Sequence, residues 1–396
     1  MADLAQATTT RSRTSFINDP KIRSILFQLA ALIIIVVLGW DFIQNAQENL
    51  KAQNIATGFG FMENTAGFGI SQTLIPYSES STYGRAFLVG VLNTLLVAVV
   101  GIFIATIIGL LVGVGRLSKN FVVRLLSSVY VELLRNLPPL FQILFWYLAV
   151  LSALPNPRQS ISLFGEAYLS NRGFIVPRPI FADGSGYVLW ALGLAIVLAV
   201  FVSSWSKNRL EETGRPLPTF WMNVGLIVGL PLIAMVLTGF PVTFEVPELK
   251  GFNFAGGVRI IPEFIALTVA LATYTAAFIA ENVRAGIMAV SHGQTEAAHS
   301  LGLRSSQTLR LVVIPQAMRV IIPPLTSQYL NLTKNSSLAV AIGYPDLVAV
   351  FAGTTLNQTG QAIEIIAITM GVYLLISIIT SVIMNAYNKR VALVER

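Results

Sequence analysis

The sequence predicts an all-α polytopic membrane protein with about eight transmembrane helices. Hydrophobic residues make up 54% of the 396 residues, and charged residues make up only 11%, which is about half the usual share in soluble proteins. Several long stretches also contain no Asp, Glu, Lys or Arg. Because about 20 apolar residues cross the hydrocarbon core, and because the backbone must satisfy itself there, each stretch is expected to be a helix. The uncharged stretches are 86–115, 136–157, 184–206, 216–244, 264–280 and 365–388.

Each expected helix is bounded by charged or turn-forming residues. Pro138 and Pro139 lie inside the third helix and predict a kink or break, because proline removes a backbone donor. Gly343-Tyr344-Pro345-Asp346 interrupts the seventh helix, which has the weakest pattern. A signal peptide is an alternative for the first helix, but no small-residue cleavage site follows Trp40-Asp41-Phe42, which favours an uncleaved span. In chain order the helices are expected at about 24–43, 86–115, 125–153, 187–206, 219–240, 262–284, 336–352 and 363–387.

The distribution of basic residues predicts the orientation. With eight helices, 18 of the 26 Lys and Arg residues fall on the side of the two termini, seven fall on the opposite side, and Arg135 lies within the third helix. Cytoplasmic segments carry the excess of basic residues in membrane proteins. Both termini are therefore expected to be cytoplasmic, together with the polar segment 285–334.

Composition also argues against several other functions. The net charge of +7 does not come from basic residues clustered with stacking aromatics, so the expected partner is the lipid bilayer and not a nucleic acid. The chain has no cysteine, and no Lys is followed by Ser or Thr, so it has neither a disulfide nor a GK[ST] phosphate loop. His292 and His299 are seven residues apart, unlike the i,i+4 pair of a zinc helix. We therefore expect no metal site, no catalytic residue and no nucleotide site in this chain.

One polar segment, Glu296 to Pro315, is longer than a simple turn between spans needs to be. Ser291 and Gln294 have the spacing of a capping box for a first short helix, and Gly302 can end that helix in the left-handed conformation. Ser305 or Ser306 can cap a second helix, which Pro315 is expected to limit. The residues expected to contact a partner are Glu296, Ala297, Ala298, Gly302 and Pro315.

The spacing of this segment resembles the EAA loop of ABC-importer permeases, which docks onto a separate ATPase. Longer motifs narrow the resemblance to the polar amino-acid family of these permeases. They are AFIAENVRAGI (277–287) with GQTEAA (293–298), ELLRNLP (132–138) with Gln142, and LTKNSSL (332–338). The resemblance implies a type I importer core of five helices, a second homologous permease subunit, a pair of ATPase subunits that use ATP and Mg, and a periplasmic amino-acid-binding protein. It also implies location in a bacterial inner membrane.

The rest of the chain elaborates this core with one N-terminal helix and two inserted helices. That layout resembles the larger permease subunit of the general L-amino-acid transporters. The expected segments are 1–84 (tail, first helix and periplasmic segment), 85–153 (core helices two and three), 154–261 (insertion with helices four and five) and 262–396 (core helices six to eight, including the coupling loop 285–334). The implied function is import of L-amino acids from periplasm to cytoplasm.

Four polar residues within or near the spans are candidates for the substrate pathway, because ionisable groups in membrane segments are often functional. They are Glu132, Arg135, Gln142 and Glu281. Glu132 and Arg135 could instead pair with each other, and Asn93 and Thr94 could be helix-packing contacts.

Two other functions are compatible with a bundle of spans. An ion-gradient-driven secondary transporter would predict inverted repeats with buried ion ligands, and no convincing repeat is found. A structural or assembly membrane protein would leave the EAA spacing unexplained.

Overall fold

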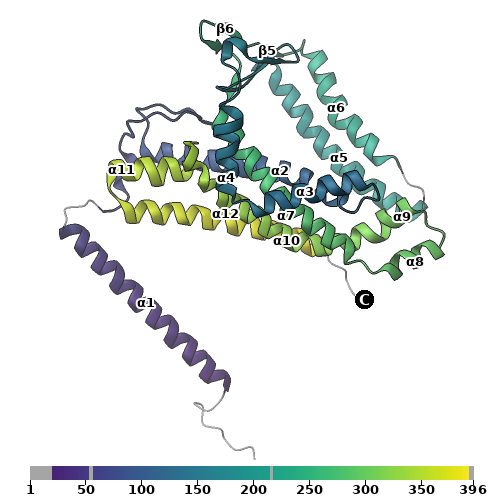
Figure 1. The fold of residues 1–396 in the computed structure, drawn as a ribbon, viewed down its shortest axis with the longest axis horizontal. Helices are drawn as coiled ribbons and strands as arrows, with labels where there is room; N and C mark the ends of the chain where they lie inside the picture. Colours follow the sequence, from purple (N-terminus) through teal and green to yellow (C-terminus); the bar gives the residue numbers. More distant parts are fainter. Residues whose placement is uncertain (1–19, 53–56, 215–216, 392–396) are drawn as a thin grey trace, which may run out of the picture.

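The computed structural model describes residues 20–52, 57–214 and 217–391, and the fold is mostly helical (Figure 1). Seven helices in these residues are long and apolar enough to cross a membrane, or eight if one bent pair counts as a span. This confirms the predicted fold class. Residues 1–19 of the predicted basic tail lie outside the described residues.

The long helices are α1 (Pro20–Ala52), α2 (Tyr83–Gly115), α3 (Phe121–Asn136), α5 (Ser185–Thr213), α6 (Thr219–Leu237), α7 (Pro262–Met288), α10 (Ile314–Asn335) and α12 (Ala362–Val391). The shorter α-helices are α4 (Pro139–Leu144), α8 (His292–Ser300), α9 (Ser305–Thr308) and α11 (Leu356–Thr359). Turns of 3-10 helix are η2 (Gly60–Glu63), η4 (Pro157–Gln159) and η6 (Ser336–Ile342), and π-helical turns are η3 (Phe145–Leu151), η5 (Leu309–Val313) and η7 (Val348–Thr355).

Helix α7 is the centre of the bundle and packs against α2, α3, α4 and α10. Glycines on α2 allow the closest of these contacts. A Cβ atom added at Gly113 would lie 2.8 Å from the carbonyl oxygen of Ala280, and one added at Gly109 would lie 2.5 Å from Ile279. Small residues at a helix interface let backbones approach, which favours van der Waals packing inside a membrane.

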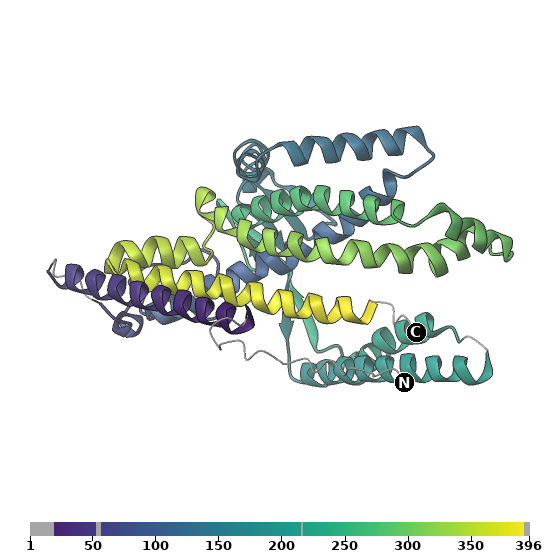
Figure 2. The ribbon, with the colours of Figure 1, turned by 90° about the horizontal axis from the view of Figure 1, so that it is seen from below.

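The third span is bent, as the two prolines predict. Leu137 has an extended backbone (φ −99°, ψ 131°), and Pro139 is the first residue of α4, where its missing N–H costs no hydrogen bond. The axes of α3 and the following α4–η3 segment differ by 108°. Figure 2 shows this turn: α3 runs across the view in dark blue, and the helix that follows it is seen end-on at its left end.

The seventh span begins much earlier than predicted. The structure has a continuous helical segment from Ser305 to Ile342, so α10 occupies residues that were expected to belong to the loop 285–334, and the helix predicted at 336–352 is replaced by η6 and η7. Three prolines and the charges of Arg319 and Lys334 lower the apparent hydrophobicity of α10. The prolines are tolerated because the neighbouring helices α7 and α12 pack against α10.

Polar side chains of α2 hold the segment that interrupts the predicted seventh helix. Asn93 Nδ2 donates to the carbonyl of Pro345 (2.8 Å), and the Leu347 amide donates to Thr94 Oγ1 (3.0 Å). The buried Asp346 carboxylate accepts from the Ala349 amide (2.8 Å) and lies 3.4 Å from the Tyr373 hydroxyl. Asn93 and Thr94 are therefore packing residues in this structure.

The predicted loops within 154–261 contain short antiparallel strands. One sheet has the order β1 (Ile161–Leu163), β2 (Ala167–Ser170), β3 (Gly173–Val176) and β8 (Val258–Ile260), and two-stranded sheets pair β4 (Arg178–Phe181) with β5 (Val242–Glu245) and β6 (Glu248–Lys250) with β7 (Asn253–Ala255). Strand β8 runs directly into α7. The strands therefore lie at the end of α7 opposite to α8 (Figure 1).

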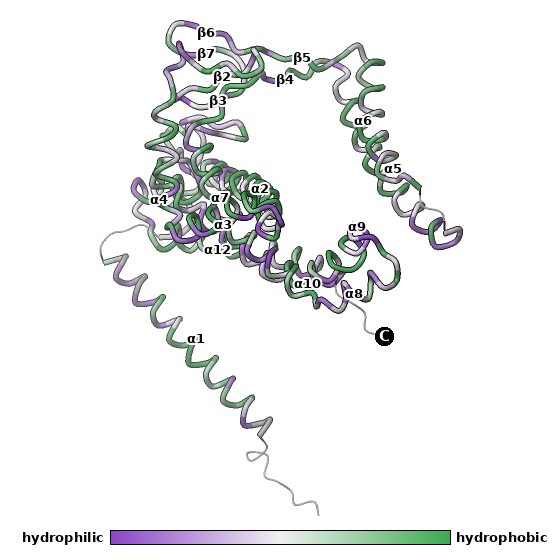
Figure 3. Tube along the Cα trace, turned by 45° about the vertical axis from the view of Figure 1, so that its right-hand side comes forward, coloured by the Kyte–Doolittle hydropathy of each residue, from purple (hydrophilic) through white to green (hydrophobic). Residues whose placement is uncertain are grey.

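The inserted helices α5 and α6 form a hairpin that stands beside the bundle. They pack against each other, and Ser206 and Thr219 share a hydrogen bond of 2.6 Å between their hydroxyl groups. Figure 3 shows the hairpin as largely hydrophobic and separate from the other long helices. Its apolar exposed surface is suited to lipid.

Candidate functional site

The segment 292–308 forms a helix, a glycine corner and a second short helix. Gly302 has φ +78°, in the left-handed region that glycine adopts at low cost. Its amide donates to the carbonyl of His299 (2.9 Å), and the Leu303 amide donates to the carbonyl of Ala298 (3.2 Å). These two bonds form a Schellman motif, which ends α8 and fixes the direction of the chain after it.

The predicted contact residues differ in exposure on this corner. Ala298 is buried, whereas Glu296 and Ala297 are exposed, and the Glu296 carboxylate lies 2.9 Å from His292 Nδ1. Leu301 is 83% exposed immediately before Gly302. Sequence reasoning placed Leu301 on one helical face with Ala297 and Ala298 but did not include it among the contact residues, because only the fold shows how exposed it is. Leu301 therefore adds an exposed apolar side chain to this corner.

Three local details of the corner differ from expectation. Ser291 precedes α8 but its side chain makes no capping bond. The residue that precedes α9 is Arg304, not Ser305 or Ser306, and its amide donates to Gln307 Oε1 (3.0 Å). Pro315 does not end a helix, because it directly follows the π-helical turn η5 and lies inside the continuous helical segment from Ser305 to Ile342.

Charged residues from three helices gather near the end of α7 that leads into α8, and we refer to Arg116, Glu132, Arg135, Glu281 and Arg284 as the arginine–glutamate cluster. Glu281 Oε1 lies 2.6 Å from Arg284 Nη2, and Glu281 Oε2 contacts Arg116 directly and lies 3.9 Å from Arg135 Nη1. Glu132 is 3.9 Å from Arg116. The predicted alternative of a local Glu132–Arg135 pair is thus replaced by links between helices.

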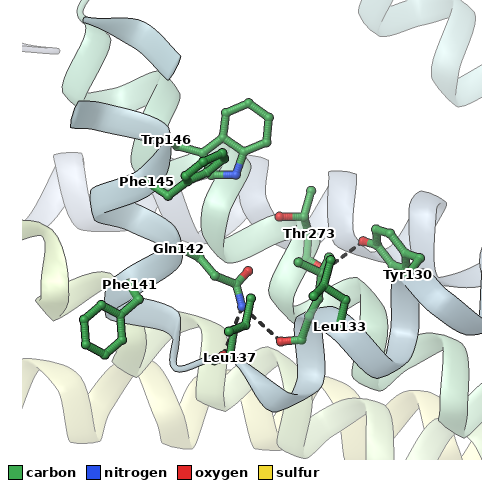
Figure 4. Close-up of a pocket in the computed structure, with 9 residues that line it drawn as sticks. Tyr130, Leu133, Leu137, Phe141, Gln142, Phe145, Trp146 and Thr273 are labelled. Carbon is green, nitrogen blue, oxygen red and sulfur yellow. Dashed lines mark hydrogen bonds between the residues drawn. The ribbon is translucent and has the colours of Figure 1, made fainter. Parts of the chain in front are cut away.

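Gln142 holds the bend between α3 and α4. Its side-chain amide donates to the carbonyls of Leu134 (3.0 Å) and Leu137 (3.1 Å), as Figure 4 shows. It also lines an apolar cavity of about 460 Å³, together with leucine and aromatic side chains of α3, α4 and η3 and with Thr273 of α7. The side chain of Gln142 therefore stabilises the bend between α3 and α4.

A second cavity, of about 260 Å³, lies between α7 and α10 and has a more polar lining. Its lining residues are Tyr274, Thr275, Phe278, Gln328, Asn331 and Asn335. We refer to it as the polar cavity. The Arg135 guanidinium lies 5.3 Å from the centre of the ring of Phe278, which is one of the lining residues. The sequence missed this site because the α10 half was expected to be loop.

Metal binding finds no support in the described residues, where no group of three His, Cys, Asp or Glu side chains could hold an ion. His292 pairs with Glu296, and His299 Nδ1 lies 3.1 Å from the carbonyl of Leu303. Both histidines are exposed. Both of these contacts are to residues of the segment 292–308.

Comparison with known proteins gives consistent matches. Residues 191–393 match the family described as "Binding-protein-dependent transport system inner membrane component". The chain is 56% identical to "General L-amino acid transport system permease protein AapQ" of Rhizobium johnstonii, over 96% of this chain and 95% of that protein. It is 54% identical to "Putative amino-acid ABC transporter permease protein YhdX" of Escherichia coli, over 98% of each chain. It is 42% identical to "Glutamate/glutamine/aspartate/asparagine transport system permease protein BztB" of Rhodobacter capsulatus, over 96% of each chain.

The seven or eight candidate spans define a polytopic membrane protein. The chain belongs to the family of binding-protein-dependent transport system inner membrane components. It is therefore a multi-pass inner-membrane permease of an ABC importer, a class whose permease subunits carry no nucleotide site of their own. The predicted resemblance to ABC-importer permeases is confirmed. Dependence on a binding protein and on an ATPase follows from the family.

Proposed function

We propose that this permease imports L-amino acids from the periplasm to the cytoplasm. Support for the cargo comes from the relatives, since proteins 56% and 42% identical over nearly the whole chain are named for transport of L-amino acids and of acidic amino acids with their amides. The polar cavity fits this chemistry, because amide and hydroxyl groups can bind the ammonium and carboxylate of an amino acid. ATP and Mg act on a pair of partner ATPase subunits.

The observation that carries the coupling proposal is the corner at Gly302. On this proposal a partner ATPase subunit contacts the exposed face of α8, including Glu296, Ala297 and Leu301. The Schellman motif makes the corner rigid, and the Gln316 side chain donates to Gln294 Oε1 (3.3 Å), which links α8 to the start of α10. A displacement of α8 is therefore passed on to α7 and α10 and is not absorbed by a flexible loop.

The orientation proposed for the chain has both termini in the cytoplasm. The excess of Lys and Arg on the side of the termini supports it. The strands of the insertion then lie on the periplasmic side, at the opposite end of α7 from α8 (Figure 1). This leaves the strand side for a periplasmic amino-acid-binding protein. A second homologous permease subunit completes the translocation pathway.

Among the four predicted pathway residues, Arg135 is the one whose position fits the polar cavity best. It lies over Phe278, which lines the cavity, and its charge suits the carboxylate of an amino acid. Gln142 is engaged at the helix bend, and Glu132 and Glu281 belong to the arginine–glutamate cluster. We propose that an amino acid passes through the polar cavity next to Arg135.

An uptake panel in cells that lack this gene tests the cargo. Restoring the gene should restore uptake of a radiolabelled L-amino acid, and unlabelled L-amino acids should compete with it. Asn335→Ala should raise KM more than it lowers the maximal rate, because Asn335 lines the cavity. Competition by sugars or metal ions but not by amino acids would contradict the proposal.

A further inference from the structure

Glu281 lies where three helices meet. Its Oε1 atom is engaged by Arg284 of the same helix, and its Oε2 atom is engaged by Arg116 at the end of α2 and faces Arg135 of α3. The side chain of Arg116 is only 12% exposed and that of Glu281 only 24%. One carboxylate therefore links α2, α3 and α7.

The position of Glu281 along α7 connects this link to the coupling corner. Glu281 lies two turns before Met288, where α7 ends, and α8 begins at His292. Between these points Gly286 packs so closely on α10 that an added Cβ atom would overlap the Ile321 side chain. The end of α7 is therefore held to α2 and α3 by charge and to α10 by packing.

The charges in the cluster make the carboxylate hard to replace. The guanidinium groups of the cluster outnumber its carboxylates by three to two. The Glu132 side chain is 65% exposed and lies 3.9 Å from Arg116, so it is a weak second partner. Charge-assisted hydrogen bonds are about twice as strong as neutral ones. Removing the Glu281 charge would leave partly buried arginines facing one another, which pushes the helix ends apart.

The same geometry argues against a direct contact between Glu281 and the cargo. Both of its oxygen atoms are engaged by arginines, and the residues described as lining the polar cavity do not include it. A carboxylate that binds cargo needs an oxygen facing the pathway. Glu281 instead faces the three helix ends that would have to move together.

We propose that Glu281 is a positioning residue that makes α2, α3 and α7 move as one unit with the coupling corner. The role rests on the proposed function, because it supposes that an ATPase moves α8. Loss of the charge uncouples ATP hydrolysis from import: the ATPase still turns over, but the displacement of α8 no longer reaches α2 and α3. The polar cavity keeps all six residues that line it, and Arg135 keeps its charge, so the affinity for cargo should change far less than the coupled rate of import.

The test compares Glu281→Gln with Glu263→Gln in the complete transporter, reconstituted with its ATPase and binding protein. Glu263 is a matched control on the same helix, since it lies in the first turn of α7 and accepts a hydrogen bond from Tyr147 (2.9 Å) that glutamine also accepts. Glu281→Gln should lower the maximal uptake rate about tenfold. KM and the ATPase rate should stay within about twofold, and Glu281→Asp should recover part of the rate. Glu263→Gln should behave as wild type.

Other outcomes would overturn the proposal. A change of KM or of amino-acid preference with ATPase and uptake still coupled would make Glu281 a cargo ligand, and an equal loss in Glu263→Gln would show a general effect of charge removal. If Glu281→Gln does not assemble, Arg116→Lys decides, since it keeps the charge but loses the planar fork. That variant should assemble and show a reduced maximal rate, and a wild-type rate would refute the link. A wild-type complex that imports nothing would refute the proposed function instead.

Discussion

Replacing Gly302 by alanine is the sharpest perturbation of the coupling corner. An added Cβ atom would meet no heavy atom within 4 Å, so the cost is purely one of backbone conformation. A left-handed backbone (φ +78°) costs a residue with a Cβ atom roughly 1–2 kcal/mol. Such a cost changes an equilibrium by a factor of about 5–30. We expect uptake to fall by a factor in that range, because the corner opens or turns in another direction.

Two further variants separate conformation from size. Gly302→Asn should retain most of the uptake, because asparagine adopts the left-handed region more readily than alanine. Gly293→Ala is the matched control inside α8, where the added Cβ atom also meets no heavy atom within 4 Å and φ is helical. It should leave uptake unchanged and stabilise α8 by about 0.5–1 kcal/mol.

The assay is binding-protein-dependent uptake of a radiolabelled amino acid together with ATPase activity of the purified complex. Membrane levels of each variant are measured by immunoblot, so that a loss of uptake is not confused with a loss of protein. Equal uptake by Gly302→Ala and Gly293→Ala would refute the reasoning, because the left-handed corner would then have no part in coupling. So would a Gly302→Asn variant as impaired as the alanine variant.

Three more predictions follow from particular contacts. Gly109→Leu should destabilise the purified protein by about 1–3 kcal/mol through overpacking against Ile279. Gly371→Leu on α12 should not, because an added Cβ atom there meets nothing within 4 Å. The melting temperature in detergent distinguishes the two variants. Leu301→Ala should weaken co-purification of the ATPase without changing membrane levels, and unchanged co-purification would contradict a docking role. The buried Asp346 carboxylate accepts a hydrogen bond from the Ala349 amide (2.8 Å). Asp346→Ala should lower the melting temperature in detergent, because it leaves that buried donor without its acceptor, and an unchanged melting temperature would contradict a structural role for Asp346.

Much of the fold follows from hydropathy, because a span must exclude charge whatever it packs against. The α2, α5, α6, α7 and α12 spans appear close to their predicted positions, and the two prolines mark the bend of the third span. Helix α10 was missed because one of its faces lines the polar cavity with Gln328, Asn331 and Asn335. A polar face lowers the mean hydropathy of a helix, so a helix that faces a polar pathway resembles a loop when all its residues are averaged.

The site was only partly visible in the sequence for a related reason. Gly302 could be identified because its conformational role is local and belongs to a recurring spacing. The cluster around Glu281 could not, since Arg116 and Arg135 lie more than a hundred residues away in the chain and meet it only in the folded bundle. The short strands were likewise hidden, because β3 pairs with the distant β8 and neither strand has a long alternating pattern.

Energy coupling is the central claim, and proteoliposomes test it most directly. The complex of this permease with its ATPase and the proposed second permease subunit is reconstituted with the binding protein and a radiolabelled L-amino acid on the side opposite the ATPase. Uptake should require Mg-ATP on the ATPase side and should continue when an ionophore removes the proton gradient. Uptake that proceeds without ATP and stops with the ionophore would contradict the account and favour transport driven by an ion gradient.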